Sequence, residues 1–413
     1  MIRTFFKQST PFELVIFFLY LIVVLCLFVY SFTQIDLSLA LSRVQSVQDI
    51  VVQFQHIGYF QRPLSTTLYI SIVLLITAFY LLFLRKAFIG TLKKVYLWGL
   101  VGITAILLTF SYNAFSYDIF NYIFDAKIVT HYGDNPYNQK ALDYPTDPML
   151  SFMRWTHREY PYGPVWLGIT VPISFLGFNI FIITFFMFKL LATAAYVGTV
   201  YYIGKVAEHL TKGREVLAMV FFGLNPLIII ESVVSAHIDI VMIFLAIWAL
   251  WLLVQRQTSL AYLLLFMSIG IKFVTGFFLP VFLFLHRKLK KKHSYNWDRY
   301  AFVTVFFLIV AVVFETQQSG NFQPWYLIVP LAFAAFIAHN YFILLPSIII
   351  STFALFTYVP FLYTGNWDPP IPQHLSDMYF FSYSISLFAV AVVFFYKQIR
   401  YAQSVKNKKE KKR

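Results

Sequence analysis

Charged residues are scarce in this chain. Asp, Glu, Lys and Arg make up only 12% of its 413 residues, whereas 60% are hydrophobic. Soluble domains carry about 25% charged residues, so this deficit argues against a soluble fold. Cysteine is almost absent: Cys26 lies in the first apolar segment, and a single cysteine excludes an intramolecular disulfide. Flexible linkers and repeats of fixed period are missing as well.

Long apolar segments dominate the chain instead. They predict an all-α fold, a polytopic transmembrane helical bundle of about 11–13 spans that forms one integral membrane domain over residues 1–413. The first segment is longer than a signal-peptide core and no small-residue cleavage site follows it, so we expect a retained span. The segments lie near 12–33, 64–84, 95–114, 179–203, 216–234, 238–254, 259–285, 300–314, 325–338, 341–363 and 378–396.

Basic residues predict the orientation. The net charge is +14, and the excess lies in short connections and a basic tail at 401–413 rather than on one soluble face, which argues against nucleic acid as a partner. Basic connections face the cytoplasm, so we expect both termini inside and the tail near anionic headgroups. The residues concerned are Arg3, Lys7, Arg85, Lys86, Lys93, Lys94, Lys205, Lys212, Arg214 and the runs 286–293 and 406–413. The segments 35–63, 115–164, 235–237, 315–324 and 364–377 then face outward.

Two apolar segments do not fit as simple spans. Segment 165–177 has about thirteen residues, too few to cross a bilayer. Segment 259–285 lies between Arg256 and Arg287, both expected in the cytoplasm, so it must enter and return with Lys272 near its turn. Re-entrant helices and short spans both fit these lengths. Because irregular backbone at membrane depth is tolerated where it lines a wet cavity, both segments predict a polar cavity that opens to the outer face.

The loop 115–164 concentrates acidic residues. It holds five Asp and one Glu, in a chain with 18 acidic residues. Asp118 follows an apolar segment by about one helical turn, where partial desolvation raises a carboxyl pKa and suits a general base. Asp125 lies seven residues further on, so a helix places both on one face. Capping a helix or pairing with Arg is the alternative for Asp118. We predict an outer catalytic loop with juxtamembrane or re-entrant helices over 115–177.

Aromatic corners follow in the same loop. The motifs HYGDNPYN (131–138), DYPTDP (143–148) and YPYGP (160–164) combine Tyr with the turn residues Pro, Gly, Asn and Asp. Aromatic faces beside carboxylates suit a sugar, although such corners also fix a loop at a membrane interface. The candidate substrate contacts here are Asn135, Tyr137, Arg158, Tyr160 and Tyr162.

Later segments add polar residues on the predicted outer side. His237 and Asp239 are candidates for a hydrogen-bonded pair or a substrate contact, and as two of the ligands of a divalent cation, which stays open. Lys272 lies in an apolar hairpin and needs a partner, either a substrate phosphate or an acid such as Glu231. Trp325 begins a span, where it serves an aromatic belt or a substrate contact.

The order of these motifs resembles a known family. Asp118 outside an early span, Tyr122, GDNPY (133–137), DP (147–148) and YPYGP (160–164) look like the first outer loop of C-superfold (GT-C) membrane glycosyltransferases. The likeness is greatest to prokaryotic mannosyltransferases that use polyprenol-phosphate-mannose, and it extends over about 95–330 through the later motifs, by their order alone. One departure is that the acids do not form a compact Asp-Asp or Asp-x-Asp pair, which leaves the role of Asp125 as a substrate ligand open.

The resemblance implies a function. It implies transfer of a hexose, mannose by this likeness, from a polyprenyl-phosphate donor to a hydroxyl of a glycan, glycolipid or protein at the outer face of the plasma membrane. Asp118 would be the base and Lys272 or Arg158 the phosphate contact, and direct displacement would invert the anomeric carbon. The absence of a glycine-rich nucleotide loop agrees with a lipid-linked donor. The alternatives are a secondary transporter or flippase, and a scaffold, polysaccharide polymerase or ligase.

Overall fold

The computed structural model describes residues 10–410, apart from 43, 212 and 291–295. Part of the orientation prediction depends on Arg3, Lys7, Lys212, 291–293 and 411–413, which lie outside the described residues. Most side chains of 401–410 in the predicted tail lie outside them too.

Every regular element of the described chain is helical, which confirms the all-α fold. The α-helices are α2 (Pro11–Ser31), α3 (Gln45–Gln55), α4 (Arg62–Ile89), α5 (Lys94–Thr109), α6 (Asp118–Lys127), α7 (Pro164–Leu176), α8 (Phe181–Leu210), α9 (Glu215–Gly223), α10 (Pro226–Ile229), α11 (Asp239–Val254), α12 (Thr258–Ile271), α13 (Leu279–Lys290), α14 (Trp297–Ser319), α15 (Ile328–Ala334), α16 (Tyr341–Phe356), α17 (Val359–Thr364) and α18 (Ile371–Glu410). Short 3-10 and π-helical turns, labelled η, connect several of them. The one bridge of β type in this part of the chain joins Lys140 to Glu159.

In the described part of the chain, six helical segments are long and apolar enough to cross a membrane, which makes the protein multi-pass. They are Pro11–Gln34, Arg62–Ile89, Phe181–Leu210, Trp297–Ser319, Tyr341–Thr364 and Ile371–Arg400, and the pair Glu215–Gly223 and Pro226–Val234, bent by 57°, would be a seventh. Five shorter apolar helices accompany them: Lys94–Thr109, Pro164–Leu176, Asp239–Val254, Thr258–Ile271 and Pro324–Ile337. Sixteen helical residues extend about 24 Å, less than the roughly 30 Å of a hydrocarbon core. The 11–13 predicted spans therefore include several that are short for a bilayer.

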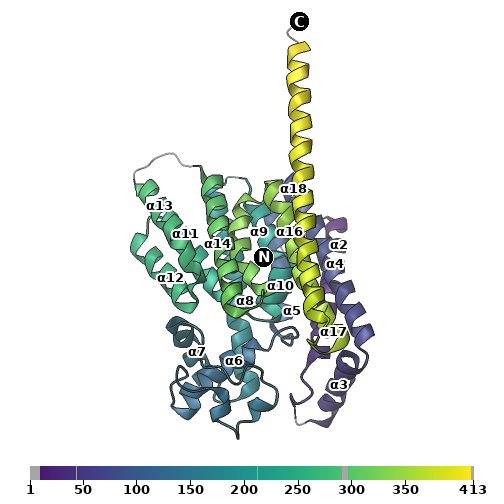
Figure 1. Cartoon of the computed structure of the whole chain (residues 1–413), viewed down its shortest axis with the longest axis vertical. Helices are drawn as coiled ribbons and strands as arrows, with labels where there is room; N and C mark the ends of the chain where they lie inside the picture. Colours follow the sequence, from purple (N-terminus) through teal and green to yellow (C-terminus); the bar gives the residue numbers. More distant parts are fainter. Residues whose placement is uncertain (1–9, 43, 212, 291–295, 411–413) are drawn as a thin grey trace.

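The connections predicted as cytoplasmic meet at one end of the bundle. Lys94 pairs with Glu208 at 3.1 Å, and Arg214 pairs with Asp298 at 3.6 Å. Helices α3, α6 and α7 lie at the end of the molecule opposite the C-terminal end of α18 (Figure 1). The segments 35–63 and 115–164, both predicted to face outward, therefore lie at the same end of the bundle. The side of the membrane that this end faces stays a prediction.

Both misfit segments form short helices. Segment 165–177 forms α7, a helix of 13 residues. In the other, α12 ends at Ile271, Lys272 is extended, and a 3-10 turn (Phe273–Phe278) leads into α13. The Tyr262 hydroxyl near the start of α12 lies 2.8 Å from Nδ1 of His286 near the end of α13. The predicted hairpin over 259–285 is therefore present, with Lys272 at its turn.

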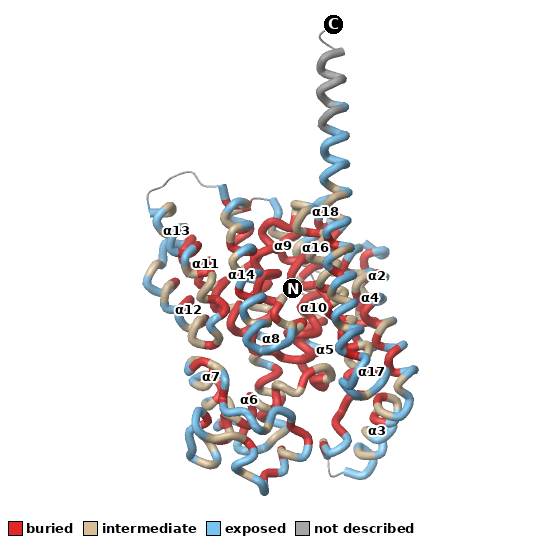
Figure 2. The backbone as a smooth tube through the Cα atoms, in the orientation of Figure 1, coloured by how far each residue is buried: buried red, intermediate tan, exposed pale blue. Residues whose placement is uncertain are grey.

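The broken segment α9–α10 runs through the centre of the molecule. Nearly every residue from Leu217 to Ile243 is buried (Figure 2). The segment includes a π-helical turn, η6 (Ile230–Val234), and an irregular stretch before α11. Irregular backbone in an apolar environment needs protein or water around it, and this location provides protein on all sides.

Candidate active site

Asp118 is the first residue of α6, at the end of the bundle that carries the outer loops. Its backbone N–H donates to the Ser116 hydroxyl at 3.1 Å, which fixes the start of the helix. The side chain is 17% exposed, and Oδ2 lies 3.5 Å from Nδ1 of His237. Burial raises the pKa of Asp118 above its ordinary value, and the charges of His237 and Lys272 offset part of this rise. A carboxylate in such surroundings is a stronger base than one in water.

His237 is fully buried behind Asp118. It follows Ala236, whose φ of 57° turns the chain between η6 and α11. Nε2 of His237 lies 3.3 Å from Oε2 of Glu231, and the imidazole stacks on Trp325 with ring centroids 4.0 Å apart. The other Glu231 oxygen accepts a hydrogen bond of 2.9 Å from the Tyr358 hydroxyl. One imidazole therefore separates a partly exposed carboxylate from a buried one.

Lys272 contacts two carboxyl groups at the turn of the hairpin. Its ammonium is 3.2 Å from Asp239 and pairs with Glu315 at the end of α14. It also lies 4.9 Å from the centroid of the Tyr326 ring. The acidic partner expected for Lys272 is present, although it is Asp239 with Glu315 rather than Glu231. One half-buried ammonium therefore contacts two carboxyl groups.

His237 and Asp239 contact different groups despite their spacing. His237 lies between Asp118 and Glu231, whereas Asp239 pairs with Lys272. Within the described ranges, no group of three or more His, Cys, Asp or Glu side chains is arranged to hold a metal ion.

Four predicted tyrosines form a row of edge-to-face contacts. Tyr122 meets Tyr162 at 5.4 Å, Tyr162 meets Tyr160 at 5.6 Å, and Tyr160 meets Tyr137 at 5.0 Å between ring centroids. Burial raises the pKa of Asp125 to about 8. The charges of Asp118 and Asp125 both raise the pKa of Tyr162, which places this tyrosine near the two carboxylates. The structure therefore brings Asp125 to the tyrosine row.

Asn135 and Arg158 lie on the surface of the loop. The Asn135 side chain accepts the Tyr137 backbone N–H at 3.0 Å and so fixes the turn. The Arg158 guanidinium covers the Trp155 ring at 4.4 Å, and its charge still contributes to lowering the pKa of Asp118. Both are therefore exposed on the loop, unlike the buried His237 and Glu231.

The glycine of YPYGP joins the outer loop to the hairpin. Gly163 donates its backbone N–H to the Ile271 carbonyl at 2.9 Å. A Cβ on Gly163 would lie 2.1 Å from the Gly270 carbonyl oxygen, so no larger residue fits this approach. The contact occurs directly before Lys272, so the loop with Asp118 and the turn with Lys272 form one continuous piece.

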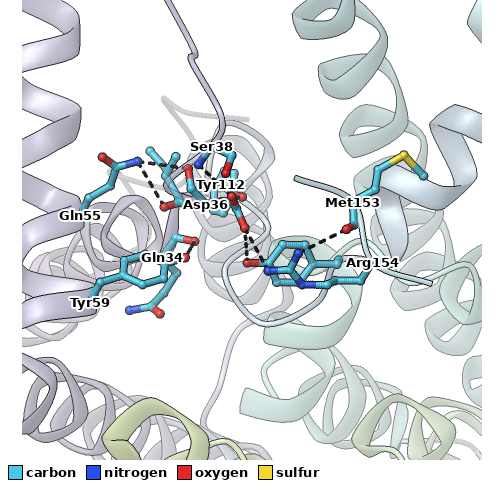
Figure 3. Close-up of polar contacts among 10 residues, drawn as sticks. Gln34, Asp36, Ser38, Gln55, Tyr59, Tyr112, Met153 and Arg154 are labelled. Atoms are coloured by element: carbon cyan, nitrogen blue, oxygen red, sulfur yellow. Dashed lines mark hydrogen bonds and ion pairs between the residues drawn. The ribbon is translucent and has the colours of Figure 1, made fainter. Parts of the chain in front are cut away.

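A second polar cluster attaches the first outer segment beside Asp118. Asp36 is buried, and its Oδ2 accepts from the Tyr117 hydroxyl at 2.9 Å and lies 3.4 Å from Arg154 (Figure 3). Arg154 also covers the Tyr117 ring at 4.8 Å. Gln55 donates to the Asp36 carbonyl at 3.1 Å. Tyr117 directly precedes Asp118, so this cluster fixes the entry to α6.

Lys189 supports the broken segment from α8. It is fully buried and donates to the carbonyls of Val233 and Val234, the latter at 2.6 Å, and to the Ser111 hydroxyl at 3.2 Å. These carbonyls end η6, between Glu231 and His237.

Sequence reasoning missed five of these residues. They are Asp36, Arg154, Lys189, Glu315 and Tyr358. Lys189 carried a signal, because a lysine inside an apolar segment needs acceptors. Asp36 directly follows the first apolar segment and carried a weaker one.

The comparison with protein families decides the identity of the chain. Residues 24–287 match the model of a family described as alpha-(1->6)-mannopyranosyltransferase, N-terminal domain. The chain belongs to this mannosyltransferase family. Membership confirms the resemblance to GT-C mannosyltransferases and assigns the chain to the glycosyltransferases rather than to transporters or flippases. The match includes Asp118, His237 and Lys272, whereas Glu315, Trp325 and Tyr358 follow it. No curated protein and no solved structure matches the chain.

Proposed function

We propose that this mannosyltransferase moves mannose from a polyprenyl-phosphate donor to a hydroxyl acceptor at the outer face of the plasma membrane, with Asp118 as the general base. The observation that carries the proposal is the position of Asp118. It is partly exposed at the loop end of the bundle, its pKa is raised by burial, and it lies between a histidine and a row of tyrosines. The lipid-linked donor suits a site at the membrane edge, because donor and enzyme share the bilayer.

The reaction is a single displacement. The acceptor oxygen bonds to the anomeric carbon as the bond from that carbon to the phosphate oxygen breaks. Asp118 takes the acceptor proton, and the lipid phosphate leaves with the bonding electrons. Displacement from the opposite face inverts the anomeric centre. The family is described by an α-(1→6) linkage, so inversion requires a β-linked donor and a 6-hydroxyl on a glycan or glycolipid acceptor.

Lys272 is assigned to the donor phosphate. Phosphate is an adequate leaving group when a cation neutralises it, so the reaction needs no general acid. Lys272 already pairs with Asp239 and Glu315, so the phosphate has to replace one of these contacts. Glu315 is the acid to be displaced, because Asp239 is fixed at the first turn of α11.

The remaining predicted residues are assigned to the sugars and their surroundings. Rings accept the apolar faces of a sugar, while carboxylates and amides accept its hydroxyls. The assigned substrate contacts are Tyr122, Asp125, Asn135, Tyr137, Arg158, Tyr160, Tyr162, Asp239 and Trp325, whereas the buried His237 is assigned to Asp118. Asn135 and Arg158 lie where a long acceptor would extend over the loop.

The test is mannosyl transfer by the purified protein in vesicles. The substrates are polyprenyl-phosphate-mannose and an α-mannoside with a free 6-hydroxyl, and the protein is wild type, Asp118→Asn or Asp143→Asn. We expect Asp118→Asn to lose at least a hundredfold in kcat, the usual contribution of a general base. Asp143 is an exposed acid of the same loop, so its variant should keep full activity. Unchanged transfer by folded Asp118→Asn would remove Asp118 from this role.

A further inference from the structure

Asp118, His237 and Glu231 lie in one line from the partly exposed edge of the site into its buried interior. Oδ2 of Asp118 is 3.5 Å from Nδ1 of His237, and Nε2 of His237 is 3.3 Å from Oε2 of Glu231. His237 and Glu231 are fully buried, whereas Asp118 is 17% exposed. Each nitrogen of the imidazole therefore faces one carboxylate, and only the outer carboxylate reaches the substrate side.

Residues from several helical segments hold His237 and Glu231 in place. Trp325 stacks on the imidazole at 4.0 Å, with 17° between the ring planes. Tyr358 donates to the far oxygen of Glu231 at 2.9 Å. Lys189 binds the carbonyls of Val233 and Val234 between Glu231 and His237. Three helical segments distant in the sequence therefore fix the geometry of one imidazole.

No hydrogen bond of normal geometry from the described residues satisfies the imidazole nitrogens of His237. Both nitrogens of His237 and Oε2 of Glu231 are buried and have no hydrogen-bond partner of normal geometry in the described chain. Such groups are costly in an apolar interior unless they interact with one another as charges. The short distances let the imidazole become an imidazolium between two carboxylates without any side chain moving far.

We propose that His237 receives the proton that Asp118 takes from the acceptor, and that Glu231 is the positioning residue that holds His237 for this transfer. The inference rests on the proposed base role of Asp118. The acceptor O–H bond breaks as the glycosidic bond forms, and the proton passes to Oδ2 of Asp118 and then to Nδ1 of His237. Asp118 regains its negative charge, and the imidazolium remains paired with Glu231. After the products leave, the proton returns through Asp118 to water.

Other charged and titratable groups face Asp118, His237 and Glu231 and influence the pH dependence of the proposed proton transfer. They are Asp239, Lys272 and Arg158 near Asp118, the hydroxyls of Tyr122, Tyr162 and Tyr358, and Tyr69 behind Glu231. Glu231 is the acid that faces the inner nitrogen of His237. Its replacement by a neutral group removes a negative charge beside the relay, so Asp118 and His237 together bind the proton less tightly.

The experiment compares Glu231→Gln with Ser232→Ala in the mannosyl-transfer assay. Ser232 is the next residue of η6, equally buried, and its hydroxyl has no hydrogen-bond partner in the described chain, which makes it a matched control. We expect Glu231→Gln to lose roughly tenfold or more in kcat with an unchanged KM. The acidic limb of its pH profile should move to lower pH. Ser232→Ala should match wild type in both.

Two outcomes would overturn the inference. One is a Glu231→Gln profile with the kcat and acidic limb of Ser232→Ala, while Asp118→Asn is inactive; Asp118 would then keep its role without the relay. If Glu231→Gln does not fold, Tyr358→Phe takes its place, because it loosens Glu231 without removing a charge. A wild-type kcat and pH profile for folded Tyr358→Phe would be the second. An active Asp118→Asn would instead refute the proposed function itself.

Discussion

At the scale of single residues, the candidate site is a set of carboxylates made different by their surroundings. Asp118 is partly exposed beside a histidine, Glu231 is fully buried, and Asp147 binds Lys127 and Tyr132 within the loop. Hydrogen bonds and the Lys127 charge lower the pKa of Asp147, although burial opposes them. Carboxylates therefore serve as the proposed base, as the buried neighbour of a histidine and as a fixed structural anion, and sequence position alone does not distinguish these roles.

Asp125 gives the stability of the protein a pH dependence. Burial raises its pKa to about 8 in the folded state, against about 3.9 in an unfolded chain. Its contribution to stability is therefore fully present below pH 4 and is lost as the pH rises toward 8. We expect Asp125→Asn to raise the thermal midpoint relative to wild type at pH 8.5 and to have little effect at pH 4.5. Equal shifts at both pH values, in detergent-solubilised protein, would contradict this.

Asp36 should influence catalysis without touching substrate. Asp36→Asn keeps the shape of the side chain but removes the charge that faces Arg154 and Tyr117. A hydrogen bond to a charged group contributes about 1.5–3 kcal/mol, and its loss would loosen the entry to α6. We expect a lower kcat with the pH profile retained, because the pKa of Asp118 is set by other groups. Asp49→Asn, in the same outer segment, is the control, and equal activity of both variants would count against the positioning role.

At the scale of elements, the loop motifs act through backbone fit. The motif YPYGP contributes Tyr160 and Tyr162 to the row of tyrosines, and its Gly163 allows the close approach to Gly270. The hairpin at 259–285 was predicted from length and charge, because two basic flanks leave no other path. The partners of Lys272 could not be predicted, because Glu315 belongs to a helix whose packing depends on the whole bundle.

Gly163→Ala should separate the loop from the hairpin. The added methyl would meet the Gly270 carbonyl at 2.1 Å, and overpacking of this kind costs about 1–3 kcal/mol. We expect a lower thermal midpoint and a higher KM for the lipid donor, since Lys272 follows this contact. Gly168→Ala in α7 is the matched control, because its added methyl meets no atom within 4 Å. A Gly163→Ala variant as stable and active as Gly168→Ala would show that the contact is not needed.

At the scale of the whole molecule, the sequence predicted the fold class and much of the cluster. Apolar segments and basic connections were enough for an all-α multi-pass bundle, and the outer motifs named Asp118, His237, Lys272 and Trp325. These side chains converge on one end of the bundle. The spacing of His237 and Asp239 suggested one pair, but His237 lies between Asp118 and Glu231, whereas Asp239 pairs with Lys272. Tyr358 and Lys189 enter through helix packing, which short-range patterns do not encode.

The orientation of the bundle can be tested with single cysteines. Cys26 is the one cysteine of the chain, so Cys26→Ser provides a background. Thr146 in the outer loop and Gln255 between α11 and α12 are both exposed. We expect a membrane-impermeant maleimide to label Thr146→Cys on intact cells, and Gln255→Cys only after permeabilisation. The reverse pattern would place the loop in the cytoplasm and exclude an extracytoplasmic site.

The candidate site is built from two parts of the chain, and this division bears on how its chemistry can change within the family. The family match ends at residue 287, yet the ring under His237, the hydroxyl on Glu231 and the second acid on Lys272 all come later. The first part of the chain holds the proposed base, and the last third holds groups that contact its neighbours. Exchange of the last third would therefore change the groups that hold His237, Glu231 and Lys272, while Asp118 stays the same. Chimaeras of family members joined near residue 290 would therefore change kcat, because Trp325 and Tyr358 position the proposed relay.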